Sequence, residues 1–294
     1  MDIKVDGIVE NKSRSRSRSH DEKKDIKITE EKVEKKGFKW KKFFSIIISI
    51  IFCIFLIVIY ARFKATSGLK VYEYKVSDSS LPDSFHGVKV VQFSDLYFGN
   101  TVDIDYLDDI VSSINNLKPD IVVFTGDLIS HEVDDETKAK IIESLKSINP
   151  VIGKYAVKGD ADIDLFDEII KASGFVNVSN SSVKAFYKSD TPIVITGQDV
   201  QSDLFSILLI HQPDSLDSFE NKPNFAIAGH SLNGQINIPI VKKLFLKNGS
   251  KKYYNGFYDA DDTTLYVSNG IGTPEFKYRL FNKPSITLFR LTKY

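Results

Sequence analysis

The sequence predicts a mixed α/β domain that follows a single membrane-spanning helix. Three patterns in the 294 residues support this interpretation. In the first half of the domain, short apolar runs alternate with segments of helical spacing, which implies right-handed βαβ units and a mostly parallel sheet. In the second half, strand-like runs predominate. Before the domain, an uncharged apolar run at residues 43–61 predicts the membrane helix.

Residues 1–42 are predicted to form a disordered basic tail. They carry 14 Lys or Arg against 9 Asp or Glu, and Arg alternates strictly with Ser from Ser13 to Ser19. High charge with few apolar side chains is typical of segments that cannot bury enough surface to fold. A basic segment that contacts anionic lipid or RNA, tuned by serine phosphorylation, is the alternative.

The run at residues 43–61 is just long enough to span a bilayer. A secretory signal peptide is the competing interpretation, but its apolar region is usually shorter and its charged leader is not 42 residues long. Residues 35–42 include five lysines, whereas residues 62–70 include three basic residues. The positive-inside rule therefore predicts a single-pass protein with a cytoplasmic N-terminus and an extracytoplasmic main domain. The only cysteine, Cys53, lies in this run, so no intrachain disulfide can form.

Residues 62–87 are expected to be a linker and domain lead-in, and residues 88–294 to form the domain. A helix at 104–117 has apolar residues spaced for one buried face and stops at Pro119. In the first half we expect strands at 88–93, 121–124 and 155–157 and helices at 104–117, 136–148 and 165–172. In the second half we expect strands at 185–187, 193–196, 207–210, 225–228, 265–267 and 286–291.

Residues of the kind that bind metal ions follow five of the apolar runs. In chain order they are Asp95, Asp127, Asp160, His211 and His230. Open α/β sheets bind ligands at the carboxyl edge of their strands, so we expect these side chains to gather there. Carboxylates and imidazoles together suit a divalent transition metal. One such Asp alone is usually a loop cap, but five at successive strand ends favour a site.

These residues and their neighbours resemble the calcineurin-like metallophosphoesterases, in particular the membrane-associated branch with a Gly-His-Thr-His-Gly-Gly-Gln block. The resemblance runs from Val88 to the C-terminus. The matching segments are SDLYFG at 94–99, TGDL at 125–128, GDAD at 159–162, HQPD at 211–214, GHSLNGQI at 229–236, LYVSNGIG at 265–272 and RLFNKP at 279–284. The resemblance implies a four-layer α/β/β/α sandwich with helices outside two packed sheets. It also implies two metal ions, with a bridging hydroxide that attacks phosphorus.

Three positions depart from the family pattern. Tyr97 and Leu232 stand where the family has His ligands, and Ala161 stands where it has its catalytic His. Asp160 replaces an Asn ligand and keeps an oxygen donor. Asn233 replaces a Gly and can adopt a left-handed turn.

The resemblance therefore implies one complete metal position and one impaired position. Asp127, Asp160, His211 and His230 would hold one divalent transition metal (Mn, Zn or Fe). The other position keeps only Asp95 and the shared Asp127, so a second metal is in doubt. Tyr97 would bind a metal ion only as a phenolate, and its pKa, ordinarily about 10, would have to fall by several units for the phenolate to form near neutral pH.

This pattern favours a membrane-anchored, degenerate phosphoesterase, a pseudoenzyme that binds a phosphorylated ligand or partner. Loss of a general acid typically costs about 10²–10⁴ in rate, and loss of a metal ion removes further nucleophile activation. The alternative is an active metal-dependent phosphoesterase with a rebuilt mononuclear site that uses Tyr97 or His131 in new roles. Its substrate would be a phosphomonoester, a phosphodiester, a pyrophosphate or a lipid-linked phosphate. In a third hypothesis the basic tail is functional and the domain is a sensor.

Other polar residues receive simpler interpretations. Residues 43–294 carry 25 Lys or Arg against 30 Asp or Glu, and an acidic domain argues against nucleic acid as its partner. Asp162 and Asp164 precede a predicted helix and are expected to be caps. Arg279 is expected to hold the C-terminal segment rather than a phosphate.

Overall fold

The computed structural model describes residues 39–239 and 241–294. Most of the predicted basic tail lies outside these residues. Helix α1 (Trp40–Ile59) continues as a π-helical turn, Tyr60–Lys64. Its most apolar window has a mean hydropathy of 3.0 and is not buried by the rest of the described chain. A helix that is apolar and exposed on all sides is typical of a membrane span, so α1 is the one candidate span among the described residues.

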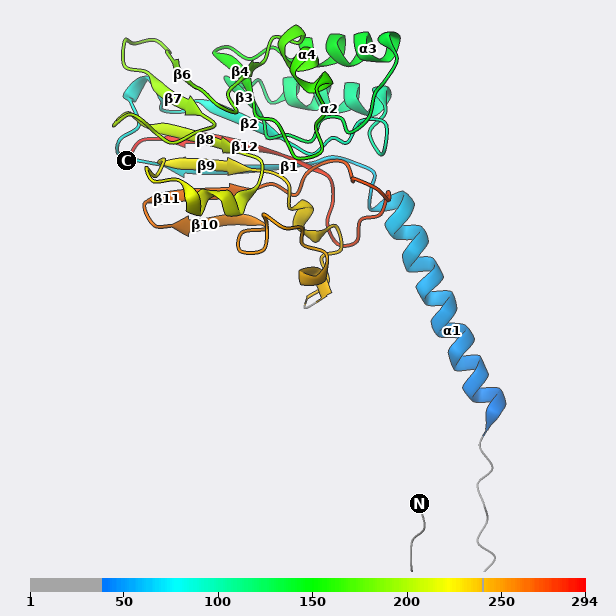
Figure 1. Cartoon of the computed structure of the whole chain (residues 1–294). Coiled ribbons are helices and arrows are strands. Elements are labelled where there is room, and N and C mark those ends of the chain that lie inside the picture. The colour runs from blue at the N-terminus through cyan, green and yellow to red at the C-terminus, as the bar shows by residue number, and fades with distance from the viewer. Residues whose placement is uncertain (1–38, 240) are drawn as a thin grey trace, which may run out of the picture. The chain divides into compact units, whose positions relative to one another are not determined.

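The first sheet has six strands in the order β1-β12-β2-β3-β4-β5. The strands are β1 (Lys70–Ser77), β2 (Lys89–Phe93), β3 (Ile121–Phe124), β4 (Gly153–Ala156), β5 (Val176–Asn177) and β12 (Ser285–Thr292). Strands β2 to β5 pair in parallel, whereas β12 runs antiparallel to β2. Helices α2 (Ile104–Asn116), α3 (Asp135–Lys146) and α4 (Leu165–Ala172) connect the parallel strands and lie on one side of this sheet (Figure 1).

The second sheet also has six strands, in the order β10-β11-β9-β8-β7-β6. The strands are β6 (Ser182–Ala185), β7 (Ile193–Thr196), β8 (Ser206–Ile210), β9 (Phe225–Ala228), β10 (Gly256–Ala260) and β11 (Thr263–Val267). The four central strands are parallel, and antiparallel strands close both edges. The central strands β7, β8 and β9 are buried throughout, as continuous apolar runs such as Ile207–Ile210 predict.

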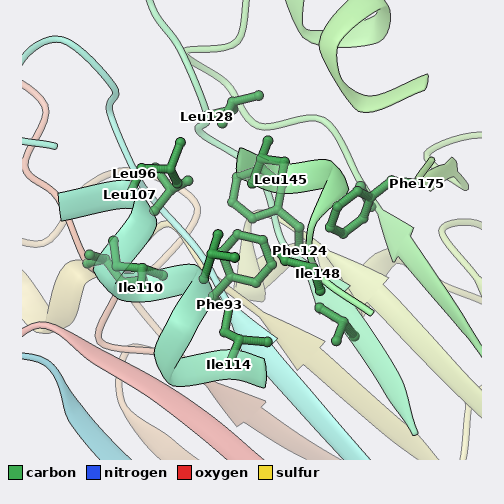
Figure 2. Packing of buried hydrophobic residues seen from close by; sticks show 14 of the residues in the cluster. Phe93, Leu96, Leu107, Ile110, Ile114, Phe124, Leu128, Leu145, Ile148 and Phe175 are labelled. Atoms are coloured by element: carbon green, nitrogen blue, oxygen red, sulfur yellow. The ribbon is translucent and has the colours of Figure 1, made fainter. Parts of the chain in front are cut away.

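Three apolar clusters hold the layers together. One lies between the first sheet and helices α2, α3 and α4, where Phe93 and Phe124 pack with their ring centroids 4.7 Å apart (Figure 2). The second fills the space between the sheets and includes Phe225 and Phe289. The third covers the outer face of the second sheet with Leu216 and other side chains.

The two-sheet sandwich expected from the sequence is confirmed, and its fourth layer is thin. In the part of the chain that the structure describes, the outer face of the second sheet carries no α-helix. A 3-10 helix, Pro213–Ser218, and the aromatic rings of Tyr253 and Tyr258 cover it instead. Helix α4 and strands β3, β7 and β9 have the bounds predicted from the sequence.

Strand β1 lies within residues 62–87, the segment expected to be a linker and domain lead-in. All eight of its residues pair in parallel with β12, so this segment belongs to the first sheet. Two further strands, β5 and β10, were not expected, and β6 ends at Ala185 instead of beginning there.

Candidate metal centre

The five predicted metal-binding residues all follow strands at the carboxyl edges of the two sheets. Asp95, Asp127 and Asp160 follow β2, β3 and β4 of the first sheet, and His211 and His230 follow β8 and β9 of the second. Asp95, Asp127 and His230 have φ angles of 57°, 61° and 67°. This left-handed backbone costs a residue with a Cβ about 1–3 kcal/mol and is concentrated at functional sites.

Asp127, His211 and His230 converge, with their ligand atoms within 4.8 Å of one another. His211 Nε2 lies 3.2 Å from Asp127 Oδ2 and 3.2 Å from His230 Nδ1. All three side chains are buried. Asp160 Oδ2 lies 3.3 Å from His230 Nδ1 and accepts a hydrogen bond of 2.6 Å from Gln212 Nε2. Three of the five predicted residues therefore surround one point, and Asp160 lies beside them, next to His230.

Backbone carbonyl groups fix which nitrogen of each imidazole faces this point. His211 Nδ1 donates to the carbonyl of Thr125 at 2.7 Å, and His230 Nε2 donates to the carbonyl of Asn248 at 2.7 Å. His211 Nε2 and His230 Nδ1 are left facing each other, beside the carboxylates of Asp127 and Asp160. Backbone partners of this kind orient the histidines of metal sites. These two nitrogens and the Asp127 carboxylate are donors that one divalent metal ion could bind together, so the geometry fits such an ion.

The carboxylate of Asp127 is held as an anion. Its Oδ1 accepts the backbone N–H of Ala161 at 2.8 Å, and its Oδ2 accepts the hydroxyl of Tyr97. Burial opposes ionisation, but His211, Tyr97 and Ala161 outweigh it and lower the pKa of Asp127. Burial also opposes the charged imidazolium of His211, yet Asp127 and Asp95 raise its pKa to about 9. In the absence of a metal, a proton on His211 supplies the missing positive charge.

Asp95 lies outside the group whose ligand atoms converge. Its carboxylate accepts the backbone N–H of His230 at 3.1 and 3.2 Å and thereby fixes the loop after β9. The side chain is fully buried. Burial, joined by repulsion from Asp127 and opposed by His211, raises the pKa of Asp95 to about 6.

Comparison with known proteins agrees with this geometry. Residues 88–267 match the family model described as calcineurin-like phosphoesterase. The chain belongs to this family. Members of the family use divalent metal ions, and here Asp127, His211 and His230 supply a possible site for one.

Similar proteins include bacterial metallophosphoesterases and a vertebrate protein named as transmembrane. The uncharacterized metallophosphoesterase YkuE of Bacillus subtilis is 29% identical over 253 residues, which are 79% of this chain and 88% of that protein. A zebrafish (Danio rerio) protein named transmembrane protein with metallophosphoesterase domain is 28% identical over 265 residues, 79% of this chain but 59% of its own length. Phosphodiesterase YaeI of Escherichia coli is 22% identical over 221 residues, covering 69% and 82% of the two chains.

Tyr97, one of the three residues that depart from the family pattern, brings a hydroxyl group and, through Lys247, an ammonium group next to Asp127. Tyr97, buried, donates to Asp127 and accepts a hydrogen bond of 2.9 Å from Lys247 Nζ. The ammonium also lies 5.2 Å from the centroid of the Tyr97 ring. Burial and the charges of Asp95 and Asp127 raise the pKa of Tyr97 far above its ordinary value, so the phenol stays neutral.

The other two departures from the family leave no donor side chain. Leu232 is buried, and a Cβ on Gly270 would lie 2.5 Å from its Cδ2 and 2.9 Å from Asp95 Cβ. Leu232 and Asp95 therefore both pack against the backbone of Gly270. Ala161 contributes only its backbone N–H, which binds Asp127.

Two residues of the centre were missed or misassigned from the sequence. Lys247 lies in an irregular segment, where no periodic pattern could have identified it. Asp162 is not a helix cap, because its buried carboxylate accepts four backbone N–H groups, at 2.6 to 3.0 Å, from residues 127–129 and Gly159. It thus fixes the loop that carries Asp127. Nor does the side chain of Asp164 cap α4.

Arg279 has the role expected from the sequence, and His131 lies apart from the centre. Arg279 is fully buried and donates to the carbonyls of Asn269 and Gly272 at 3.0 and 2.7 Å, so it holds the C-terminal segment as predicted. His131 is exposed, and its ring lies against Gly99 rather than at the converging atoms.

Proposed function

We propose that this protein is a membrane-anchored, mononuclear member of the family that binds phosphate esters and hydrolyses them weakly or not at all. Asp127, Asp160, His211 and His230 would hold one Mn²⁺, Zn²⁺ or Fe²⁺ ion. Such an ion, when bound, supplies a Lewis acid for a phosphoryl oxygen. The observation that carries the proposal is the convergence of the Asp127, His211 and His230 ligand atoms, with both imidazoles oriented by backbone carbonyls.

Lys247 supports the assignment of a phosphate ligand. An ammonium group has three N–H donors, and among the described residues Lys247 Nζ uses one of them, on Tyr97. The other two are available to phosphate oxygens beside the metal position. Hydrogen bonds between charged partners contribute about 1.5–3 kcal/mol each.

The same residues oppose rapid hydrolysis. Ala161 has no group that can donate a proton to a leaving oxygen. The neutral phenol of Tyr97 is hydrogen-bonded to Asp127 and is not available as a base. An ammonium group can attract a phosphate, but unlike a second metal ion it cannot generate a hydroxide nucleophile.

The candidate membrane helix indicates where the domain would meet its ligand. Helix α1 would span a membrane once, with the N-terminus in the cytoplasm and the domain outside, as the excess of lysines before the helix predicts. The ligand would then be a phosphorylated small molecule or a lipid-linked phosphate.

An active phosphodiesterase is the second candidate, because Asp127, His211 and His230 offer a possible metal site and the similar YaeI is named a phosphodiesterase. The full chain in lipid nanodiscs, loaded with Mn²⁺, separates the two functions. We expect inorganic phosphate to bind, Lys247→Met to weaken this binding by about tenfold or more, and an aryl phosphodiester to turn over at the background rate. Lys184→Met, at an exposed lysine on β6, is the matched control. Turnover that Asp127→Asn abolishes would refute weak hydrolysis in favour of the active enzyme.

A further inference from the structure

A mostly apolar groove of about 450 Å³ lies beside the metal centre. Two segments far apart in the sequence form it, the irregular chain after β9 and the loop before β12. Its apolar lining is Ile236, Phe245, Pro274, Phe276 and Tyr278, and its polar lining is Gln235, Lys247 and Glu275. Phe276 is 70% exposed and Phe245 is 49% exposed although both line one groove, and exposed apolar side chains gathered in a groove commonly mark a binding site.

Lys247 joins this groove to the centre. Its side chain lines the groove, and its ammonium donates to Tyr97, which in turn donates to Asp127. A molecule in the groove would therefore contact apolar side chains and, on the side that leads to the centre, the Lys247 cation. This polarity matches an amphiphile with a phosphate at one end and a hydrocarbon chain at the other.

The loop that lines the groove is attached to the chain just after α1. The backbone N–H of Arg279 donates to the carbonyl of Ala61 at 3.1 Å, and the guanidinium of Arg62 lies 5.9 Å from the ring centroid of Tyr278. Ala61 and Ala65 are buried. The groove is thus formed by the loop that contacts the end of the membrane helix.

Exposed aromatic side chains flank this attachment in the chain. Phe63 and Phe281, each two residues from a partner of the Arg279–Ala61 hydrogen bond, are 68% and 67% exposed. Aromatic residues at the end of a membrane span commonly lie at the level of the lipid headgroups. An exposed apolar face beside the span indicates contact with the bilayer.

We propose that the ligand of this centre is the phosphate ester of a membrane lipid, with a hydrocarbon chain in the groove and the phosphate at Lys247 and the metal position. This inference rests on the proposed function and adds the class of ligand. The bilayer supplies the occupant, because the lining loop is attached to the residues at which the chain leaves the membrane helix.

Alkyl phosphates of increasing length test this assignment on the full chain in nanodiscs with bound Mn²⁺. Dissociation constants are measured for inorganic phosphate, butyl phosphate and octyl phosphate, and empty nanodiscs correct for partition into lipid. Each fully buried methylene strengthens binding by about fourfold. We expect octyl phosphate to bind at least about tenfold more tightly than butyl phosphate, since the groove is partly open.

Variants of the groove distinguish the binding of a hydrocarbon chain in the groove from the binding of phosphate at the centre. Phe245→Ser with Phe276→Ser should remove the gain with chain length and leave the affinity for inorganic phosphate unchanged. Phe186→Ser, at a phenylalanine that is 55% exposed and outside the groove, should keep the gain. Equal affinities for butyl and octyl phosphate, or a gain that survives in the groove variant, would overturn the lipid assignment alone. If none of the three phosphates binds, the proposed function fails and this inference fails with it.

Discussion

Restoring the family's histidines should not restore a second metal ion unless Lys247 is also removed. The variant Tyr97→His, Ala161→His and Leu232→His supplies the missing donor side chains. A histidine at position 97 would hold an ion about 2 Å from its ring nitrogen. The Lys247 ammonium lies 2.9 Å from the Tyr97 oxygen, so it would lie within a few ångströms of that ion.

The repulsion between the Lys247 ammonium and the second metal ion determines whether that ion binds. Two unit charges 4 Å apart interact by about 1 kcal/mol in water and about 4 kcal/mol at the effective dielectric of a protein surface. For a divalent ion these values double, to about 2–8 kcal/mol. Rotation of the lysine side chain relieves part of the repulsion, so we expect the triple variant to bind a second ion at least about 30-fold more weakly than the same variant with Lys247→Met.

Metal content by mass spectrometry and the Mn²⁺ electron paramagnetic resonance spectrum together provide the assay. We expect one ion per chain in the triple variant and two in the quadruple variant that adds Lys247→Met. The triple variant with Lys184→Met controls for the loss of a surface charge and should keep one ion. Two ions in the triple variant with Lys247 intact would show that the ammonium does not block the second position.

Three further predictions concern the loops and the protonation of the centre. Asp162→Ala should lower the free energy of unfolding by about 3 kcal/mol or more, because four backbone N–H groups lose a charged acceptor; thermal melts should show little change for Asp164→Ala, whose side chain caps nothing. His230→Ala should leave the fold intact and abolish metal binding, measured as metal content after dialysis against the free ion; a retained stoichiometric ion would contradict the ligand set. In the metal-free protein the pKa of His211 is raised from 6.5 to about 9. Its contribution is therefore complete below pH 6.5 and is lost as pH rises through 9, so chemical denaturation should show up to about 3 kcal/mol less stability at alkaline pH; His211→Gln should remove this dependence.

The sequence predicted the elements whose side chains carry a strong burial pattern. Helix α2 begins where expected at Ile104, and the Asp103 side chain caps it through the backbone N–H of Tyr106 at 2.9 Å. Strand β1 was missed although Tyr72, Tyr74 and Val76 alternate with charged residues. At the edge of the sheet only Val76 is buried, so the apolar signal is weak.

The residues of the candidate site likewise differ in whether a sequence pattern identifies them. Asp127, His211 and His230 could be found because each follows a buried strand, and parallel strands bring such positions to one edge. Lys247 could not be found, because a lysine in an irregular segment is placed by tertiary contacts that leave no pattern in the sequence. Asp162 was misassigned because its position before α4 is typical of a cap, whereas its carboxylate binds the loop after β3.

The departures from the family were identified from the sequence, but their consequence was not. Tyr97 was considered as a phenolate ligand. The structure instead places a neutral phenol between the Asp127 carboxylate and the Lys247 ammonium.

The number and environment of metal ions in the unmodified full chain test the central claim most directly. Mn²⁺ titration followed by electron paramagnetic resonance should give one ion per chain with the spectrum of an isolated Mn²⁺ and coupling to two imidazole nitrogens, those of His211 and His230. Two spin-coupled ions per chain, or one ion without nitrogen coupling, would contradict it.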